Sequence, residues 1–365
     1  MIRLLHTESS MNLGGQELRI LLEMEGLSGR GFESVLAAEP GSRILAEALA
    51  RGHRAYPVKM RGSFDPVAVA RFTGIIRREK IDIINAHGSK DGWSAGLAAR
   101  LTGARVIRSR HIANPIRSHL MGRLVYGPLC DLVVTTSVSI RDDMAARGVS
   151  AEKIISVPTG VDTTMFHPDV VCGAFRASLG IPETAPLVGM VSVMRGDKGP
   201  DVFVKAAELV IKKRPDAFFA LVGDGWMKRR LEEDISASAF SNRIIMAGYR
   251  RDIPSVMADL DLVVLPAKVP EGVPQVILQA HAMRRPVVAS EVGGITEVAI
   301  PGQTARGVPA GDHAALADAI IRMLYDPAEA ARLSEAGYRL VMERYTLGGM
   351  LDTMERVYRD VLARQ

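Results

Sequence analysis

Two cations stand directly before a predicted helix in the second half of the chain. The sequence Arg195-Gly196-Asp197-Lys198-Gly199-Pro200 follows a hydrophobic run and leads into a helical pattern. The unpaired N–H groups at a helix N-terminus attract anions, and two cations beside them suit a diphosphate. The alternative is a solvated loop with exposed charges. The position before a helix favours Arg195 and Lys198 as phosphate ligands.

A carboxylate beside flexible backbone is the second candidate. The sequence Pro270-Glu271-Gly272-Val273-Pro274-Gln275 follows a hydrophobic run and leads into a helix predicted over 275–283. Glu271 could hold sugar hydroxyls while the free N–H groups of the helix face phosphate. It could equally be an acidic residue that only stabilises the helix dipole. These residues alone leave both interpretations open.

Glycine-rich turns recur where hydrophobic runs end. Gly14-Gly15 follows the first run and opens a predicted helix, Gly223-Asp224-Gly225 ends another run, and Gly293-Gly294 precedes a third helix. Glycine allows the backbone to approach a ligand closely, although a plain tight turn explains any one of them. No G-x-G-x-x-G or P-loop pattern follows the first run of either half, so an NAD-dependent oxidoreductase has little support.

Histidines and acidic residues give weaker signals. His87 and His111 each follow a predicted strand, at the end where ligands bind in α/β sheets, whereas His281 lies on a helix and is assigned a structural role. Asp259-Leu260-Asp261 lies at the amino end of a predicted strand and is interpreted as a solvated turn. Without an H-E-x-x-H sequence or a cysteine pair, no metal or other cofactor is predicted.

Short hydrophobic runs that alternate with amphipathic ones must position these residues. Such runs are typical of strands buried on both faces of a parallel sheet, and the pattern between them, for example over 200–213, is helical. The alternation occurs twice. It predicts an α/β protein of two Rossmann-like, doubly wound domains that face each other across a cleft. The predicted strands are 2–6, 34–38, 81–87, 106–110, 132–136 and 154–158, followed by 187–193, 217–222, 244–248, 262–266 and 286–290.

The domain boundaries follow from length and from proline. A chain of 365 residues is long for one hydrophobic core, and prolines bracket a short helical stretch near 166–183. We therefore expect an N-terminal domain over 1–165 and a C-terminal domain over 166–345. A final helix over 346–365 is expected to pack back on the N-terminal domain.

Composition excludes several classes of protein. With 47% hydrophobic and 24% charged residues, the chain is neither disordered nor fibrous. Its two cysteines, Cys130 and Cys172, rule out a disulfide framework and a four-ligand zinc site. No apolar run approaches the roughly 20 residues of a membrane-spanning helix, and residues 2–5 are too few for a signal peptide. A cytoplasmic protein is expected.

The positive charge is concentrated in one stretch. The formal net charge is +5, yet no Asp or Glu occurs between Asp91 and Asp131. A surface of this kind could bind phosphates on a substrate or lie against anionic lipid, with peripheral attachment to a membrane. The alternative is that its arginines face water or pair with distant carboxylates. Nucleic acid is not expected as a partner because no recognition motif accompanies the charge. The arginines are Arg100, Arg105, Arg108, Arg110, Arg117 and Arg123.

The ordered set of motifs resembles the family-4 glycosyltransferases, a retaining group with the GT-B fold. The matches run along nearly the whole chain, and the stretch from Asn85 to His111 resembles bacterial members that act on cell-surface glycans such as lipopolysaccharide. The matching motifs are Gly14-Gly15-x-Glu17, Arg51-Gly52-His53, Ile81-Asp82-Ile83-Ile84 with His87, Pro158-Thr159-Gly160-Val161-Asp162, Arg195 with Lys198-Gly199, Leu221-Val222-Gly223-Asp224-Gly225, Gly248 with Asp252-Ile253, Glu271-Gly272, Pro286-Val287-Val288-Ala289-Ser290 and Gly293-Gly294-Ile295-Thr296-Glu297.

The resemblance implies roles for individual residues. Arg195 and Lys198 would bind the diphosphate of a nucleotide-sugar and stabilise charge on the leaving group. Glu271 would hold the donor sugar, and His111 would lie near the transferred sugar and the acceptor. The residues implied in donor binding are Gly14, Gly15, Gly223, Gly248, Gly272, Val273 and Gln279.

One position departs from the family pattern. The family has a second Glu eight residues after the first, which contacts the nucleotide ribose, and this chain has Gln279 there. An amide still forms hydrogen bonds but carries no charge. The resemblance therefore predicts a retaining glycosyltransferase that acts on a glycan or lipid-linked acceptor. The alternative is a weakly catalytic homologue that binds nucleotide-sugar or glycan without turnover.

Overall fold

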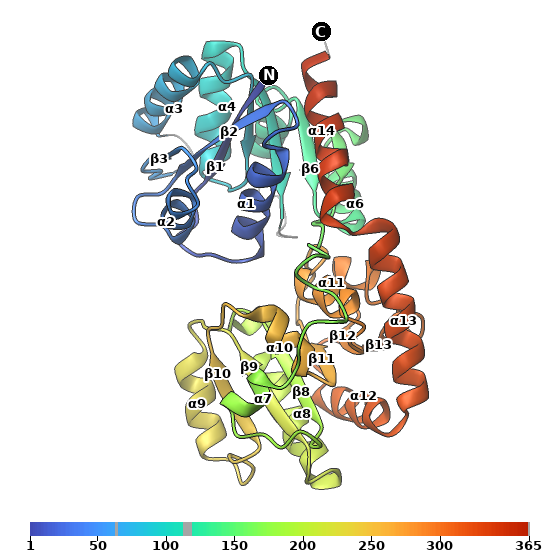
Figure 1. Ribbon diagram of the computed structural model, residues 1–365. Coiled ribbons are helices and arrows are strands. Elements are labelled where there is room, and N and C mark those ends of the chain that lie inside the picture. The colour runs from blue at the N-terminus through green and yellow to red at the C-terminus, as the bar shows by residue number, and fades with distance from the viewer. Residues whose placement is uncertain (63–64, 112–118, 364–365) are drawn as a thin grey trace. The chain divides into compact units, whose positions relative to one another are not determined.

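The computed structural model describes residues 1–62, 65–111 and 119–363, and it contains two compact units (Figure 1). The first unit comprises Met1–Thr159 and Gly348–Gln365, and the second comprises Gly160–Leu347. Within the described ranges, no helix is long and apolar enough to cross a membrane. The prediction of two Rossmann-like domains is confirmed, since each unit contains one parallel sheet flanked by helices.

The first unit is built on a seven-stranded sheet in the order β3-β2-β1-β4-β5-β6-β7, with every pair parallel. Its strands are β1 (Ile2–Glu8), β2 (Phe32–Ala38), β3 (Ala55–Pro57), β4 (Ile83–Ala86), β5 (Arg105–Arg110), β6 (Leu132–Thr135) and β7 (Ile154–Ser156). Its helices are α1 (Gly15–Leu27), α2 (Arg43–Ala50), α3 (Pro66–Glu79), α4 (Asp91–Thr102), α5 (His119–Tyr126), α6 (Val138–Ala146) and the C-terminal α14 (Leu347–Ala363).

The second unit repeats this plan with a six-stranded parallel sheet in the order β10-β9-β8-β11-β12-β13. Its strands are β8 (Leu187–Val191), β9 (Phe218–Val222), β10 (Ile244–Gly248), β11 (Leu262–Leu265), β12 (Val287–Ser290) and β13 (Arg306–Val308). Its helices are α7 (Ala174–Ser178), α8 (Pro200–Lys213), α9 (Lys228–Ser236), α10 (Ile253–Asp259), α11 (Gln275–Ala282), α12 (His313–Tyr325) and α13 (Pro327–Arg344).

Hydrophobic side chains on both faces of each sheet explain why its strands are so apolar. In the second unit, Val263 and Leu265 of β11 pack with α7, α10 and α11, whereas Leu262 and Val264 pack with α8 and α12. Successive residues of a strand point to opposite faces, so a strand covered on both sides is hydrophobic throughout. This burial holds the loops at the strand ends in fixed places.

Helix α14 is attached to the first unit by a buried polar network. The Tyr358 hydroxyl donates a hydrogen bond to Glu23 on α1 and accepts one from Asn85 Nδ2 at 2.7 Å. Asn85 Oδ1 in turn accepts a hydrogen bond from Ser109 at 2.8 Å. Arg19, fully buried, lies 3.9 Å from Glu23 and donates to the Val157 carbonyl at 2.6 Å. Burial and the Glu23 carboxylate raise the pKa of Tyr358 well above its ordinary value, so the phenol keeps its proton.

We expect Tyr358→Phe to lower the free energy of unfolding of the first unit by about 1–3 kcal/mol, because it leaves the buried Glu23 carboxylate without a hydrogen-bond donor. Urea unfolding followed by circular dichroism measures the effect. Tyr249→Phe removes a hydroxyl from a side chain that is half exposed, so it is a matched control that should leave the transition unchanged. Equal midpoints for both variants would show that the network does not stabilise the fold.

Candidate functional site

The predicted residues of the second unit gather where its strand order reverses. From β8 the chain adds β9 and β10 on one side, and it then returns to add β11, β12 and β13 on the other side. In doubly wound sheets, ligands bind at such a switch point, beyond the carboxyl ends of the strands. The loop after β8 carries Arg195 and Lys198, and the loop after β11 carries Glu271. The topology thus joins residues that are 73 positions apart.

Lys198 and Glu271 form an ion pair at this switch point. The Lys198 ammonium donates a hydrogen bond to Glu271 Oε2, and the two side chains are only 19% and 12% exposed. The second oxygen, Glu271 Oε1, is buried and has no hydrogen-bond partner among the described residues. A buried acceptor without a donor is unfavourable. The site therefore contains one acceptor that a ligand hydroxyl could satisfy.

The approach of the two loops requires glycine at position 199. Gly199 has a φ of +72°, and a Cβ atom there would lie 2.0 Å from the carbonyl oxygen of Pro266. The loops are also joined by a hydrogen bond from the Lys268 N–H to the Asp197 carbonyl at 2.8 Å. A larger residue at 199 would force the loops apart and separate Lys198 from its carboxylate partner.

The Gly293-Gly294 turn supports the Glu271 loop from the other side. The Gly294 N–H donates to the Glu271 carbonyl at 2.8 Å. A Cβ atom on Gly293, where φ is +52°, would lie 2.8 Å from both the N and the O atoms of Glu271. The sequence identified this turn as a candidate ligand loop. The structure shows that its glycines allow close packing against the backbone of Glu271.

Arg195 lies on the same loop as Lys198 but contacts a different acid. Its guanidinium is 2.9 Å from Asp197, and its side chain is 43% exposed. Its Nε atom is buried and has no partner among the described residues. Because exposed ion pairs contribute little to stability, this guanidinium can exchange Asp197 for a phosphate at small cost.

Gly223 and Gly248 bring the adjacent turns of the second unit close together. The Gly223 N–H donates to the Gly248 carbonyl at 2.8 Å. Gly223 has a φ of +140°, and a Cβ atom there would lie 1.8 Å from the carbonyl oxygen of Ser192. The turn after β9 therefore packs backbone against backbone on the loop after β8, which carries Arg195.

The start of α11 follows Glu271 directly. Gly272 and Val273 are buried, Pro274 precedes the first helical residue, and Gln279 is half-buried one turn into the helix. The N–H groups of a first helical turn have no partner within the helix and can bind an anion. The role of Gln279 at a ribose stays a prediction.

In the first unit, the Gly14-Gly15 turn is surrounded by acidic side chains. The Gly14 N–H donates to Glu17 Oε2 at 2.7 Å, and Gln16 donates to the buried Glu8 carboxyl. Burial, together with the Asp91 carboxylate, raises the pKa of Glu8 to about 8. Donor binding by Gly14 and Gly15 stays a prediction. In this structure the Gly14 N–H donates its hydrogen bond to the Glu17 carboxylate, which a ligand would have to replace.

His111 follows β5 and contacts a second histidine. Its Nε2 atom lies 3.0 Å from Nδ1 of His87, and Nε2 of His87 lies 3.0 Å from Nδ1 of His6. His6 is fully buried within β1, and the sequence analysis did not identify it as a candidate. Its position directly after the apolar pair Leu4-Leu5 of a predicted strand was the signal that could have found it.

The interpretation of Asp259-Leu260-Asp261 as a solvated turn is wrong for Asp259, whereas Asp261 is exposed. Asp259 is 3% exposed and accepts hydrogen bonds from the N–H groups of Gly173 and Arg176, the latter at 2.9 Å. Asp261 pairs with the Arg176 guanidinium at 2.6 Å. Asp259 thus satisfies backbone N–H groups at the start of α7, and Asp261 also accepts from the Leu187 N–H at 2.7 Å, so both carboxylates have structural partners.

His281 has a structural role. It is fully buried, and its Nε2 lies 3.1 Å from the Val298 carbonyl. Burial lowers its pKa to about 4, so the ring is neutral near pH 7. Its ring also lies against Gly337, where a Cβ atom would approach within 2.3 Å.

Several arginines of the basic stretch have structural partners. Arg100 and Arg105 lie 3.3 Å and 3.7 Å from Asp131. Arg108 is buried and donates to the Gly88 carbonyl at 3.1 Å, and Arg110 donates to the Tyr126 hydroxyl at 2.7 Å. Arg117 lies outside the described residues, as does the side chain of Arg123. A membrane-binding role for this stretch stays a prediction.

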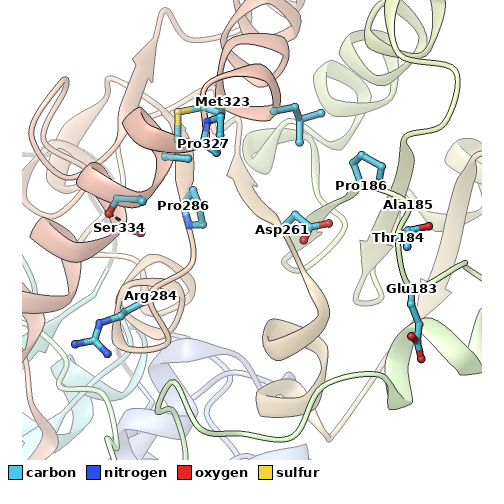
Figure 2. A pocket seen from close by; sticks show the side chains of 13 residues that line it. Glu183, Thr184, Ala185, Pro186, Asp261, Arg284, Pro286, Met323, Pro327 and Ser334 are labelled. Carbon is cyan, nitrogen blue, oxygen red and sulfur yellow. Dashed lines mark hydrogen bonds between the residues drawn. The ribbon is translucent and has the colours of Figure 1, made fainter.

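A pocket in the second unit lies at the opposite edge of the sheet (Figure 2). It is lined by Pro186, Asp261 and Pro286, which directly precede β8, β11 and β12. Two of its charged groups have partners, since Asp261 pairs with Arg176 and Arg284 pairs with Glu335 at 2.8 Å. The pocket is therefore distinct from the candidate site at the carboxyl ends.

Two family models match the chain, one to each half. The model described as Glycosyltransferase Family 4 matches residues 13–165, and the model described as Glycosyl transferases group 1 matches residues 173–340. Together the two matches cover most of the sequence.

Curated relatives with assigned activities align with large parts of the chain. An α-D-kanosaminyltransferase of Streptomyces kanamyceticus is 32% identical over 48% of this chain and 46% of its own length. A UDP-Gal:α-D-GlcNAc-diphosphoundecaprenol α-1,3-galactosyltransferase of Escherichia coli is 28% identical over 80% of both chains. A lipopolysaccharide core biosynthesis mannosyltransferase of Rhizobium leguminosarum is 31% identical over 56% of this chain and 58% of its own length.

Solved structures share the whole fold. A glycosyltransferase from Rickettsia africae superimposes with a TM-score of 0.89 at 21% identity, covering 100% of this chain and 99% of the other. Anabaena HepE in complex with UDP and glucose superimposes with a TM-score of 0.86 at 19% identity, covering 99% of this chain and 100% of the other. At these identities the likeness shows the fold alone.

Proposed function

Since this chain belongs to the family-4 glycosyltransferases of the GT-B fold, we propose that it transfers a sugar from a nucleotide-sugar donor to a glycan or lipid-linked acceptor, with retention of anomeric configuration. The observation that carries the proposal is the Lys198–Glu271 pair at the switch point of the second sheet. The pair supports the proposal because a cation suited to phosphate and a carboxylate suited to hydroxyl groups contact each other there.

The chemistry needs charge stabilisation more than it needs a strong base. A nucleoside diphosphate is a fair leaving group, and negative charge grows on it as the sugar bond breaks. Lys198, Arg195 and the first turn of α11 would stabilise that charge, because preorganised donors act without reorganisation in the transition state. Glu271 Oε1, buried and unpartnered, would accept a hydroxyl of the donor sugar. The mechanism proposed here uses no metal.

The relatives support a pyrophosphate donor and several kinds of acceptor. The Escherichia coli relative is named for UDP-galactose and a diphosphoundecaprenol acceptor, and a Corynebacterium glutamicum relative for GDP-mannose and a phosphatidylinositol mannoside. For this chain we propose a UDP- or GDP-sugar and an acceptor in bacterial cell-surface polysaccharide or lipopolysaccharide synthesis.

The first unit would bind the acceptor, with His111 near the transferred sugar. Attachment to the inner face of an anionic membrane is a further part of the proposal, since relatives are named for lipid-linked acceptors. Arg100, Arg105, Arg108 and Arg110 have partners within the protein. Arg117→Glu and Arg123→Glu test the contribution of the other two arginines of the stretch. Co-sedimentation with anionic and neutral vesicles at low and high salt tests the attachment.

Thermal unfolding with added nucleotides tests the proposed function. We expect UDP or GDP to raise the melting temperature and NAD⁺ to leave it unchanged. A ligand at one hundred times its Kd stabilises the native state by about 2.7 kcal/mol. Binding of a nucleotide-sugar without donor hydrolysis or transfer would instead support the weakly catalytic alternative. Absence of any nucleotide effect would contradict both.

Gln279→Glu tests the position at which the chain departs from its family. The substitution restores a carboxylate, so we expect nucleotide affinity to be equal or greater and transfer to be retained. The half-buried side chain lies one turn into α11. Isothermal titration with UDP and GDP measures the change, and Gln303→Glu, at an exposed turn, is the matched control. Loss of binding in a folded Gln279→Glu protein would exclude a ribose contact there.

A further inference from the structure

Three histidines form a continuous chain across the first unit. His6 lies within β1, His87 follows β4 and His111 follows β5, and these strands are consecutive neighbours in the sheet. Both ring-to-ring contacts measure 3.0 Å between nitrogens. Adjacent rings are stacked with centroids 5.3 Å apart and interplanar angles of 18° and 29°. The chain ends at His111, the residue expected to meet the transferred sugar.

The charge state of these rings is neutral near pH 7. Burial lowers the pKa of His6, His87 and His111, and the neighbouring rings lower that of His87 further. The buried Arg19 guanidinium also disfavours a cation at His87 and His111. Glu23 acts in the opposite sense on His6, but it does not outweigh burial. Each ring therefore carries one N–H and one lone pair.

When neutral histidine rings are hydrogen-bonded in a row, the tautomer of one ring fixes the tautomers of the others. Each contact needs one N–H donor and one lone pair, and each ring can supply only one of each. If His6 donates from Nδ1, His87 must carry its proton on Nδ1 and donate to His111, which then carries its own proton on Nδ1. If the hydrogen bonds run in the opposite direction, from His111 to His87 to His6, all three rings carry their proton on Nε2.

The surroundings of His6, at the buried end of the histidine row, distinguish between these two sets of tautomers. His6 Nε2 is buried and has no hydrogen-bond partner among the described residues. In the second state this atom would be a buried N–H without an acceptor, whereas in the first it is only an unshared lone pair. Buried N–H groups without partners are rarer in proteins than under-satisfied acceptors. The first state is favoured.

We propose that His6 and His87 are positioning residues that fix His111 as the Nδ1–H tautomer, so that His111 meets the sugar as a hydrogen-bond donor and not as a base. The consequence for transfer depends on the proposed function, but the tautomer itself does not. A ring held this way donates to a sugar oxygen without first selecting a proton position. The tautomer of a histidine is set by the bond that its other nitrogen makes, here to His87.

Nitrogen-15 NMR of the side chains tests the proposal without an activity assay. In the ¹⁵N-labelled protein near pH 7, we expect His111 Nδ1 to show the shift of a protonated ring nitrogen and Nε2 that of an unprotonated one. The same pattern is expected for His87. His313→Gln, at an exposed position, helps to assign the signals without touching the chain. A protonated Nε2 at His111 would overturn the proposal.

Two substitutions at His87 then connect the tautomer to turnover. His87→Gln keeps one acceptor and one donor, so we expect the Nδ1–H signal of His111 and kcat to be kept within about threefold. His87→Leu removes both the acceptor and the donor, so we expect mixed tautomers at His111. We also expect a kcat lower by about tenfold, which corresponds to the loss of one hydrogen bond of about 1.4 kcal/mol. The KM for the nucleotide-sugar should change little, because its phosphate ligands lie in the second unit.

The outcomes separate this inference from the proposed function. An Nδ1–H signal in a protein that binds no nucleotide would leave the tautomer proposal standing and remove the proposed function. Transfer activity with equal kcat in His87→Leu and His87→Gln would overturn the positioning role and leave the proposed function intact. If His87→Leu does not fold, the wild-type spectrum and His87→Gln still decide.

Discussion

Lys198→Ala is expected to lower nucleoside-diphosphate affinity and sugar transfer by about tenfold to more than a hundredfold, while the fold is retained. Hydrogen bonds to charged groups contribute about 1.5–3 kcal/mol, and each 1.4 kcal/mol corresponds to a factor of ten. The structure adds a second reason for a large effect. Lys198 is the hydrogen-bond donor to Glu271, so its removal leaves a nearly buried carboxylate without its counter-ion. That carboxylate would repel an incoming diphosphate.

Calorimetry with UDP and GDP, together with a transfer assay, measures the loss. Lys212→Ala, at an exposed position of α8, removes the same charge away from the site and is the matched control. Arg195→Ala should lower affinity in the same direction, since its guanidinium is 43% exposed and pairs with the neighbouring Asp197. Unchanged nucleotide affinity in both Lys198→Ala and Arg195→Ala would remove the phosphate assignment.

Glu271→Gln is expected to reduce kcat/KM for transfer by about a hundredfold or more, because the amide loses two interactions of a charged carboxylate worth about 1.5–3 kcal/mol each. One is the ion pair with Lys198. The other is the hydrogen bond that Oε1, now buried and unpartnered, would accept from the donor sugar. The substitution keeps shape and volume, so the loop held by Gly293-Gly294 should remain in place.

Steady-state kinetics with a nucleotide-sugar donor check this expectation, and circular dichroism checks the fold. Glu183→Gln, at an exposed position before β8 and thus at the opposite edge of the sheet, is the control. The double variant with Lys198→Ala should lose less than the sum of the two single effects, because the partners contact each other directly. Strict additivity would argue against a functional pair.

Most of the strands that the sequence predicted are buried on both faces of a sheet, the exceptions being the edge strands β7 and β10. All eleven predicted strands occur in the structure, within a few residues of the expected ends. The two that were missed, Ala55–Pro57 and Arg306–Val308, are three-residue strands at the sheet edges. Neither segment contains a continuous hydrophobic run from which a strand could be predicted, whereas the equally short β7 begins with Ile154-Ile155 and is followed by Val157.

The residues of the candidate site could be predicted singly, but their contacts could not. Arg195, Lys198 and Glu271 were identified from cations and an acid near helix starts. That Lys198 pairs with Glu271 while Arg195 pairs with Asp197 depends on the strand order and on the space left by Gly199. The prediction of a solvated Asp259 turn failed for a similar reason, because the N–H groups that it binds come from a distant segment.

Helix α14 makes the first unit discontinuous in sequence, because the second unit is inserted between the main part of the first and its last helix. The chain passes between the units twice, near Thr159 and near Leu347. A fragment that stops at residue 159 would lack Tyr358 and expose the face of α1 around Gly26, where Leu351 now packs. Exchange of the second unit between relatives by recombination would therefore have to move residues 160–347 as one segment with two junctions. A single crossover at the middle of the gene would instead join α14 of one parent to the first unit of the other.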